Sequence, residues 1–268
     1  MSTGEIDPER LVFVGGLHRS GTTLLGRVLA DHPDASGFEG TGATEDEGQH
    51  LQSVYLPAHK FGGAGRFAKN PKAHLAPPAP GDVPQVREQL LRDWGPHWDL
   101  GKHFLIEKSP PNMIMGRYLQ ATFPGSALVV IMRHPVVVAL STKKWTRTTS
   151  LKGLVGHWLT AHKKLRQDAS SLERLYVLRY EDLMTQSVIT LDALGSYLGI
   201  EGQLSAERLD GGRSDKYQKT WERMKSGSLK QRWERARIVS AFGEAMSEYG
   251  YDVEDVSSLA KPSAFDEF

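Results

Sequence analysis

A glycine-rich turn with many hydrogen-bond donors follows the first apolar run of the chain. Residues 15–25 read Gly-Gly-Leu-His-Arg-Ser-Gly-Thr-Thr-Leu-Leu and continue directly into a helical pattern. The glycines allow a ligand to approach the backbone closely, and the N–H groups of Ser20 to Thr23 are expected to point into the turn, where the helix dipole adds positive potential. A plain connecting turn would not need so many donors. The segment is therefore predicted to bind an anion.

The spacing of this turn from Gly16 onward is that of a nucleotide-binding P-loop, with one departure. Thr22 stands where the P-loop lysine is expected. Because that lysine reaches the β- and γ-phosphates, its absence argues against an ATP or GTP kinase. A P-loop kinase acting on a small molecule stays open as an alternative, as does a nucleotide-binding protein without activity.

Cationic residues follow the other predicted strands, at Lys108, Arg133 and Arg179. Ligands of open α/β sheets bind at the carboxyl ends of the strands, so these side chains are expected to converge. Pro135 stands at a plausible first position of a helix, and Ser141 follows Arg133 by eight residues. Arg133 and Ser141 could together bind a second phosphate. The alternative is a surface ion pair for Arg133 and a solvated helix serine at Ser141.

The elements that must position these residues are indicated by the apolar patterning. Continuously apolar runs predict strands that are buried on both faces, as in a parallel sheet, and they occupy residues 11–14, 104–106, 127–132 and 175–178. Amphipathic helical patterns lie between them, which favours a doubly wound α/β fold. We expect one domain over residues 1–268, with irregular loop insertions near 60–84 and 210–228 that serve either as binding segments or as surface decoration.

Composition excludes several classes of protein. The 268 residues are 39% hydrophobic and 24% charged with a net charge of +1, so no global field attracts nucleic acid or anionic lipid. Cysteine is absent, which removes disulfides and thiolate metal sites, and the scattered histidines suggest no metal set. The acidic N-terminus and the lack of a membrane-spanning apolar run predict a cytoplasmic protein without an integral membrane segment.

Five short motifs in this order resemble the sulfotransferase superfamily that uses 3′-phosphoadenosine 5′-phosphosulfate (PAPS), in particular its bacterial, tyrosylprotein-sulfotransferase-like branch. They are Arg19-Ser-Gly-Thr-Thr-Leu-Leu with Asp31-His-Pro33, Glu107-Lys-Ser-Pro110, Arg133-x-Pro with Ser141, Arg179-Tyr-Glu-Asp-Leu183 and Tyr249-Gly-Tyr-Asp252. The resemblance implies a P-loop-NTPase-like three-layer fold, in which helices flank a central parallel sheet. It also implies transfer of a sulfuryl group from PAPS to an acceptor hydroxyl, in line with a general base and without a required metal, leaving adenosine 3′,5′-bisphosphate (PAP).

The chemistry of that donor agrees with the residues. PAPS carries a 5′-phosphosulfate and a separate 3′-phosphate, and so requires two anion sites, as the sequence offers. By the resemblance, residues of the glycine-rich turn bind the 5′-phosphosulfate, Arg133 and Ser141 bind the 3′-phosphate, and Tyr180 contacts adenosine. The residues of the turn are Arg19, Ser20, Gly21, Thr22, Thr23 and Leu24.

The resemblance also suggests which residues perform the transfer. Arg19 and Lys108 are expected to act on the phosphosulfate, Lys108 near the bridging oxygen. The general base is expected to be Glu39 or Glu47, which rank nearly level, with His18 and His50 behind them; a solvated acidic turn is the alternative for this region. The acceptor is expected to be a small molecule or a peptide with a hydroxyl group, and nucleic acid is not an expected partner.

Overall fold

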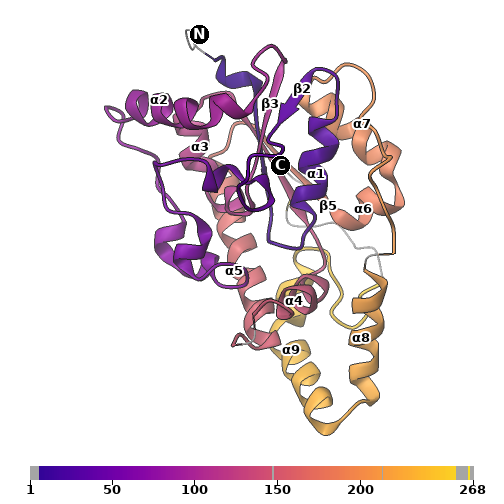
Figure 1. Cartoon of the computed structure of the whole chain (residues 1–268). Coiled ribbons are helices and arrows are strands. Elements are labelled where there is room, and N and C mark those ends of the chain that lie inside the picture. The colour runs from indigo at the N-terminus through magenta and orange to yellow at the C-terminus, as the bar shows by residue number, and fades with distance from the viewer. Residues whose placement is uncertain (1–5, 147, 213, 258–264, 266–268) are drawn as a thin grey trace.

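The fold is built around a parallel sheet, in a computed structural model that describes residues 6–146, 148–212, 214–257 and 265. Across these residues, five parallel strands pair in the order β2-β3-β1-β4-β5 (Figure 1). The strands are β1 (Leu11–Gly15), β2 (Ala35–Gly37), β3 (Phe104–Lys108), β4 (Ala127–Met132) and β5 (Leu175–Arg179). The four predicted strands are thus confirmed. The short edge strand β2 was not predicted, because its sequence Ala-Ser-Gly contains no apolar run and it pairs only with β3 among the described strands.

Helices connect the strands and cover the sheet. The α-helices are α1 (Thr22–Ala30), α2 (Val83–Trp94), α3 (Gly116–Thr122), α4 (Pro135–Lys143), α5 (Leu151–Ala169), α6 (Tyr180–Thr185), α7 (Ser187–Leu198), α8 (Asp215–Ser226) and α9 (Leu229–Ser247). Short 3-10 helices span Pro8–Arg10, Thr44–Asp46, Gly48–His50, Ala58–Phe61, Phe67–Lys69, Pro71–Ala73, Gly95–His97 and Pro110–Ile114. Among the described residues, no helix is long and apolar enough to cross a membrane.

The two faces of the sheet carry separate apolar layers, because neighbouring residues of a strand point to opposite faces. On one face, Val12 and Val14 pack with α1 and α7. On the other face, Leu11 and Phe13 pack with side chains of α2, α3 and α5. Figure 1 shows the two groups of helices on either side of the strands. This arrangement confirms the predicted three-layer α/β fold with a central parallel sheet.

A third apolar cluster corrects the expectation of a loop near residues 210–228. Most of this segment is helix α8, which lies beside α9. Tyr217, Trp221 and Met224 are buried at helical spacing and join α4, α5 and α9 in one cluster. The mean composition of α8 is polar and glycines flank it, so these three residues alone carry the signal for a helix. Tertiary packing of that stripe, rather than intrinsic propensity, stabilises it.

The other expected insertion, near residues 60–84, is largely irregular as predicted, up to the start of α2 at Val83. Burial nevertheless holds it against α5. The side chain of Phe67 is completely buried, and the neighbouring N–H of Ala68 donates to Nε2 of His157 at 3.1 Å. His74 bonds the buried Asp168 of α5 at 2.6 Å. The segment is therefore a packed wall and not surface decoration.

Replacing the buried ring of this segment should destabilise the whole protein. We expect Phe67→Ala to lower the free energy of unfolding by about 3–5 kcal/mol, since it removes a large apolar side chain and leaves a cavity. Leu56→Ala is the matched control, because Leu56 is 60% exposed in the same part of the chain and should change stability by less than about 0.5 kcal/mol. Urea unfolding measures both; equal effects would contradict the packed wall.

Candidate functional site

The turn between β1 and α1 has a backbone that requires glycine. Gly16 and Gly21 have φ angles of 147° and 109°, which L side chains rarely adopt. A Cβ atom on Gly16 would lie 2.5 Å from the carbonyl oxygen of Ile131, and one on Gly21 would lie 2.8 Å from the Tyr180 ring. Arg19 is also left-handed, with φ of 74°. The turn thus brings its backbone close to the ends of β4 and β5.

The donors of this turn are used in different ways. Because the first turn of a helix leaves its N–H groups without intrahelical partners, the amides at the start of α1 are available to an anion. Ser20 departs from the expectation that its amide would point to the ligand, because its N–H donates to the carbonyl oxygen of Leu17 at 2.9 Å. Its hydroxyl is buried without a hydrogen-bond partner.

Arg133 is buried at the end of β4 and links three segments. One guanidinium nitrogen donates to the carbonyl oxygen of Arg19 at 3.1 Å, and another donates to Oγ of Ser214, just before α8, at 2.7 Å. The guanidinium also lies 3.8 Å from the centre of the Tyr180 ring. The cation that the sequence indicated is therefore inside the site, in contact with the glycine-rich turn.

Ser141 joins the same group from α4. Nε of Arg19 donates to Oγ of Ser141 at 2.9 Å, and the Arg19 guanidinium lies 4.7 Å from the ring centre of Trp145. Helix α4 begins at Pro135, as predicted, with the His134 ring as its cap. The start of this helix determines that Ser141, two turns later, faces the glycine-rich turn.

Several of these residues line one cleft of about 670 Å³, whose described lining does not include Ser20 or Ser141. Its lining includes most of the predicted donor-binding residues and three cations that sequence reasoning missed. The lining residues are Arg19, Gly21, Thr22, Thr23, Leu24, Arg27, Glu45, Arg133, Tyr180, Arg208 and Lys216. Arg27 has a sequence signal, since it lies one helical turn beyond Thr23. Arg208 and Lys216 have none, because they reach the cleft only through the packing of α8 and of the segment before it.

Unpartnered polar atoms provide a test of what this cleft fits. Among the described residues, the Ser20 hydroxyl, Nε of Arg133 and the Tyr180 hydroxyl are buried at or beside the cleft without a hydrogen-bond partner. Such groups cost free energy unless an acceptor satisfies them. A cluster of cations and unpartnered donors fits a ligand that carries several anionic oxygens, and the separate Arg133 and helix α1 positions suit two phosphate groups.

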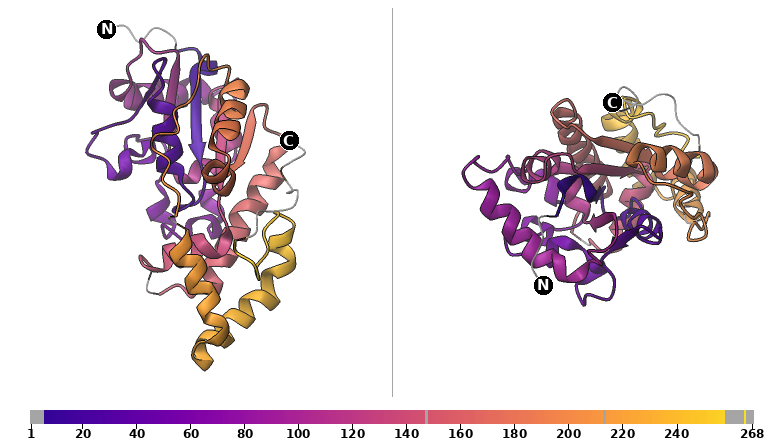
Figure 2. Two further views of the ribbon diagram at one scale, coloured as in Figure 1. Left: turned by 90° about the vertical axis from the view of Figure 1, so that its right-hand side faces the viewer. Right: turned by 90° about the horizontal axis from the view of Figure 1, so that it is seen from above.

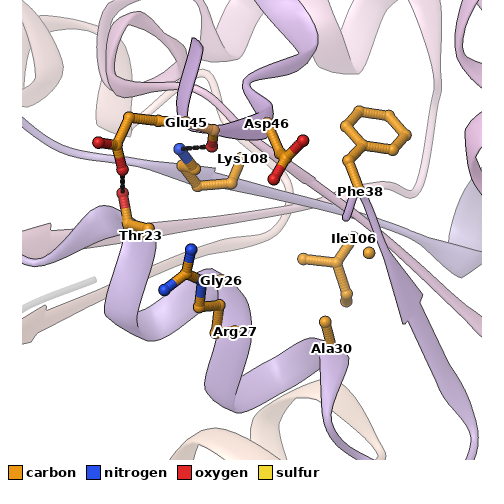
Figure 3. Close-up of a pocket in the computed structure, with 10 residues that line it drawn as sticks. Thr23, Gly26, Arg27, Ala30, Phe38, Glu45, Asp46, Ile106 and Lys108 are labelled. Carbon is orange, nitrogen blue, oxygen red and sulfur yellow. Dashed lines mark hydrogen bonds between the residues drawn. The ribbon is translucent and has the colours of Figure 1, made fainter. Parts of the chain in front are cut away.

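Lys108, at the end of β3, lies beside this cleft. A small pocket of about 40 Å³ lies here. Figure 3 shows Lys108 and Glu45 in it, with Glu45 next to Thr23 of α1. Nζ of Lys108 donates to the carbonyl oxygen of Glu45 at 2.8 Å, and the Thr23 hydroxyl bonds the Glu45 carboxylate at 3.4 Å. Thr23, Arg27 and Glu45 line both this pocket and the larger cleft. Lys108 is therefore next to the larger cleft.

Glu47 is the carboxylate that meets Lys108. Both side chains are buried, with Oε1 of Glu47 3.3 Å from Nζ of Lys108. The turn that brings them together is strained, because Glu45 and Asp46 have φ angles of 55° and 48°. The N–H and hydroxyl of Thr41 donate to the Asp46 carboxylate at 2.8 and 2.7 Å and hold this conformation.

A chain of hydrogen bonds orients Glu47 from behind. The side-chain amide of Gln49 donates to Oε2 of Glu47. The backbone N–H of Gln49 donates to Oγ of Ser109 at 2.9 Å, and that hydroxyl donates to Oε1 of the buried Glu107 at 2.6 Å. The amide oxygen of Gln49 is held by the N–H of Ala58 at 2.8 Å. The motif Glu107-Lys108-Ser109 thus supplies one partner of Glu47, Lys108, and holds the other, Gln49, through Ser109.

Burial changes the protonation of these groups. It raises the pKa of Glu47, while the positive charge of Lys108 and the hydrogen bond from Gln49 oppose the change. It raises the pKa of Glu107 to about 7, against the hydrogen bonds from Ser109 and Asn112. A buried carboxylate with a raised pKa and one cationic partner is suited to accept a proton.

The other predicted bases are placed less favourably. Glu39 is exposed, and within the described residues no ion pair joins it to Lys108. Its charge acts on Arg208, whose pKa is raised mainly by the hydrogen bond and charge of Asp31, with a smaller contribution from Glu39.

Burial lowers the basicity of the two candidate histidines, His18 and His50. Burial lowers the pKa of His18 to about 4, with the charge of Lys108 adding to the effect. Burial also lowers the pKa of His50, whose Nε2 lies 3.8 Å from Oε2 of Glu47. In the described part of the chain, no three His, Asp or Glu side chains are grouped as a metal-binding set.

Comparisons with known proteins agree with this fold. The sulfotransferase domain of the Synechococcus PCC 7002 olefin synthase is similar, with a TM-score of 0.51, 16% identity, and coverage of 87% of this chain and 94% of that one. Sulfotransferase STF9 from Mycobacterium avium has a TM-score of 0.51 and 11% identity, with coverage of 89% and 78%. At these identities the likeness concerns the fold. No curated protein matches.

The family is shown by a match along the sequence itself. Residues 11–203 match the sulfotransferase family, a range that contains the glycine-rich turn, the Glu47–Lys108 pair, Arg133 and Ser141. This range is well over half of the chain, and it includes every strand of the described sheet. The chain belongs to the sulfotransferase family.

Proposed function

We propose that this sulfotransferase takes its sulfuryl group from PAPS and transfers it to an acceptor hydroxyl. The observation that supports the choice of donor is the cleft itself, in which the start of α1 and the Arg133 guanidinium line a single cavity and can serve as two anion sites. A nucleoside triphosphate would instead require one extended phosphate site, and Thr22 stands in place of the P-loop lysine that such a site uses.

The residues divide between the two ends of the donor. Amides at the start of α1, with Arg19, bind the 5′-phosphosulfate. Arg133 and Ser141 bind the 3′-phosphate, and the Tyr180 ring, already stacked on Arg133, contacts the adenosine. This assignment is supported by the unpartnered donors of the cleft and by the resemblance of both motifs to those of PAPS-dependent enzymes.

Glu47 and Lys108 carry out the transfer chemistry in this proposal. The oxygen of the acceptor hydroxyl attacks sulfur while Glu47 accepts the proton of that hydroxyl. Loss of the proton makes the acceptor oxygen a better nucleophile. Lys108 stabilises the negative charge that develops on the leaving phosphate oxygen. Their contact at 3.3 Å keeps the base and the cation within reach of one sulfuryl group. In an in-line transfer, Glu47 then serves the attacking oxygen and Lys108 the leaving oxygen, on opposite sides of sulfur.

A thermal-shift measurement with a sulfation assay tests the proposal against its rivals. PAP should raise the melting temperature without added metal, and labelled PAPS should yield a labelled product from an extract of hydroxyl-bearing metabolites and peptides. Stabilisation by ATP with Mg²⁺ but not by PAP would favour a small-molecule kinase. Stabilisation by PAP without any sulfated product would favour a silent nucleotide-binding protein.

Arg133 should discriminate between adenosine nucleotides. Arg133→Ala should weaken PAP by roughly 10- to 100-fold and adenosine 5′-phosphate far less, because a charge-assisted hydrogen bond contributes about 1.5–3 kcal/mol. Isothermal calorimetry measures both. Arg92→Ala, in an exposed ion pair on α2, is the control with unchanged binding. Since Arg133 also packs against Tyr180, Ser141→Ala gives a milder second variant. Equal losses of affinity for both nucleotides would show that Arg133 does not bind the 3′-phosphate.

The two candidate bases should separate by turnover. Glu47→Gln should lower kcat by roughly 10²- to 10⁴-fold with PAP binding nearly intact, because the base acts in the transition state and not on the donor. Glu39→Gln should leave kcat near that of the wild type. The loss in Glu47→Gln should shrink for an acceptor with a more acidic hydroxyl. Wild-type turnover in Glu47→Gln would transfer the role of base to His18 or His50.

Gln49 should set the pH dependence of the reaction. Glu47 must be ionised to act, so activity rises with pH through its pKa, and the Gln49 hydrogen bond lowers that pKa. Gln49→Leu should therefore move the acidic limb of kcat/KM upward by roughly one pH unit, since such a bond contributes about 1.5 kcal/mol or more. Gln52→Leu is the control, because Gln52 bonds only backbone groups in the contacts described. An equal shift in both variants would show a general loss of order.

A further inference from the structure

Positive charge is concentrated in the hairpin of α8 and α9. Residues 215–237 contain eight Lys or Arg against three Asp or Glu, an excess of five in a chain whose net charge is +1. The remaining residues therefore carry a net charge of −4. The donor cleft uses only Lys216 from this group. The other basic residues of the hairpin have no role in the site described above.

The hairpin tip, residues 225–237, also carries exposed apolar side chains. Leu229 is 77% exposed and Trp233 is 61% exposed, and their spacing of four places them on the same face of α9. The buried residues of this helix, among them Arg235 and Ile238, occupy the opposite face. The guanidinium of Arg237 lies 4.4 Å from the ring centre of Trp233.

Basic residues flank the apolar pair. By helical spacing, Lys230 and Arg237 lie on one side of Leu229 and Trp233, and Arg232 lies on the other. Lys230 and Arg232 are exposed. Trp and Leu on one face with Lys or Arg beside them is the pattern of a helix that lies in the interface of an anionic membrane.

The position of the tip leaves it accessible to a flat surface. Figures 1 and 2 show the α8–α9 hairpin extending away from the sheet, with the turn between the helices at its far end. Helix α8 begins at the donor cleft and, with 12 residues, is about 18 Å long. The tip can therefore contact a surface without covering the cleft.

We propose that the hairpin tip docks on an anionic lipid surface. A membrane suits this surface better than a protein partner, because a stable protein interface buries roughly 1,200 Å² or more, while a projecting tip with two apolar side chains offers much less. An interfacial contact requires only shallow insertion of Leu229 and Trp233 together with attraction between Lys or Arg and anionic headgroups. The proposal does not depend on the identity of the sulfuryl donor or acceptor.

Vesicle sedimentation with the full chain tests the proposal. The protein should partition at least tenfold more strongly onto phosphatidylcholine vesicles containing 30% phosphatidylglycerol than onto phosphatidylcholine alone. Binding should fall at least tenfold between 0.1 and 0.5 M NaCl, because salt screens the charges of the surface. Equal partition onto both kinds of vesicle would overturn the proposal.

Exposed positions allow variants that should not disturb folding. Leu229→Ser with Trp233→Ser, and separately Lys230→Glu with Arg237→Glu, should each reduce binding to the anionic vesicles at least tenfold. The matched control combines Ile189→Ser on α7, where the side chain is 69% exposed, with Lys163→Glu on the exposed side of α5, and it should bind like the wild type. Tip variants that bind like the wild type would overturn the proposal. So would self-association that depends on Trp233 and occurs without lipid, which would assign the tip to a second copy of the chain.

Discussion

A buried cation needs polar partners, and the partners of two such cations, Arg133 and Lys108, form the site. Lys108 ends β3 and Arg133 follows β4, the two strands on either side of β1, and both residues are buried, where an unpaired charge would cost several kcal/mol. The Arg133 guanidinium donates to the Arg19 carbonyl and the Ser214 hydroxyl and lies against the Tyr180 ring. The Lys108 ammonium forms an ion pair with Glu47 and donates to the carbonyl of Glu45. Each cation thereby draws distant segments of the chain to one edge of the sheet.

The second pairing explains the unusual backbone around Glu47. Two successive residues with positive φ would not persist without compensation, and the Lys108 ammonium, the Thr41 donors and the Gln49 network supply it. Two of these contacts, those of Lys108 and Gln49, also act on the pKa of Glu47. Burial raises its pKa, while the charge of Lys108 and the hydrogen bond from Gln49 lower it.

Local charge, and not the net charge, determines what the molecule can bind. The chain is almost neutral, yet its cleft is lined by five Lys or Arg and one Glu. Helix α8 connects this cleft with the second concentration of positive charge, since Lys216 stands at its start and Lys225 at its end. A ligand with two anionic groups can therefore be recognised in the cleft, while a separate surface of the same hairpin stays free for other contacts.

Local patterns in the sequence determined four strands, several of the helices between them, the glycine-rich turn and the positions of Lys108, Arg133 and Ser141, because apolar periodicity and turn residues act over short distances. They did not show whether Glu39 or Glu47 lies beside Lys108, because both glutamates belong to an irregular segment without a periodic pattern. They also missed α8 and the cations Arg208 and Lys216, because only three buried side chains indicate that helix. Only the tertiary structure distinguishes these residues: Glu47 is buried against Lys108 while Glu39 is exposed, and packing of Tyr217, Trp221 and Met224 brings the start of α8 to the cleft. The free energy that stabilises these arrangements comes from contacts between residues far apart in the chain, and such contacts leave no local pattern in the sequence.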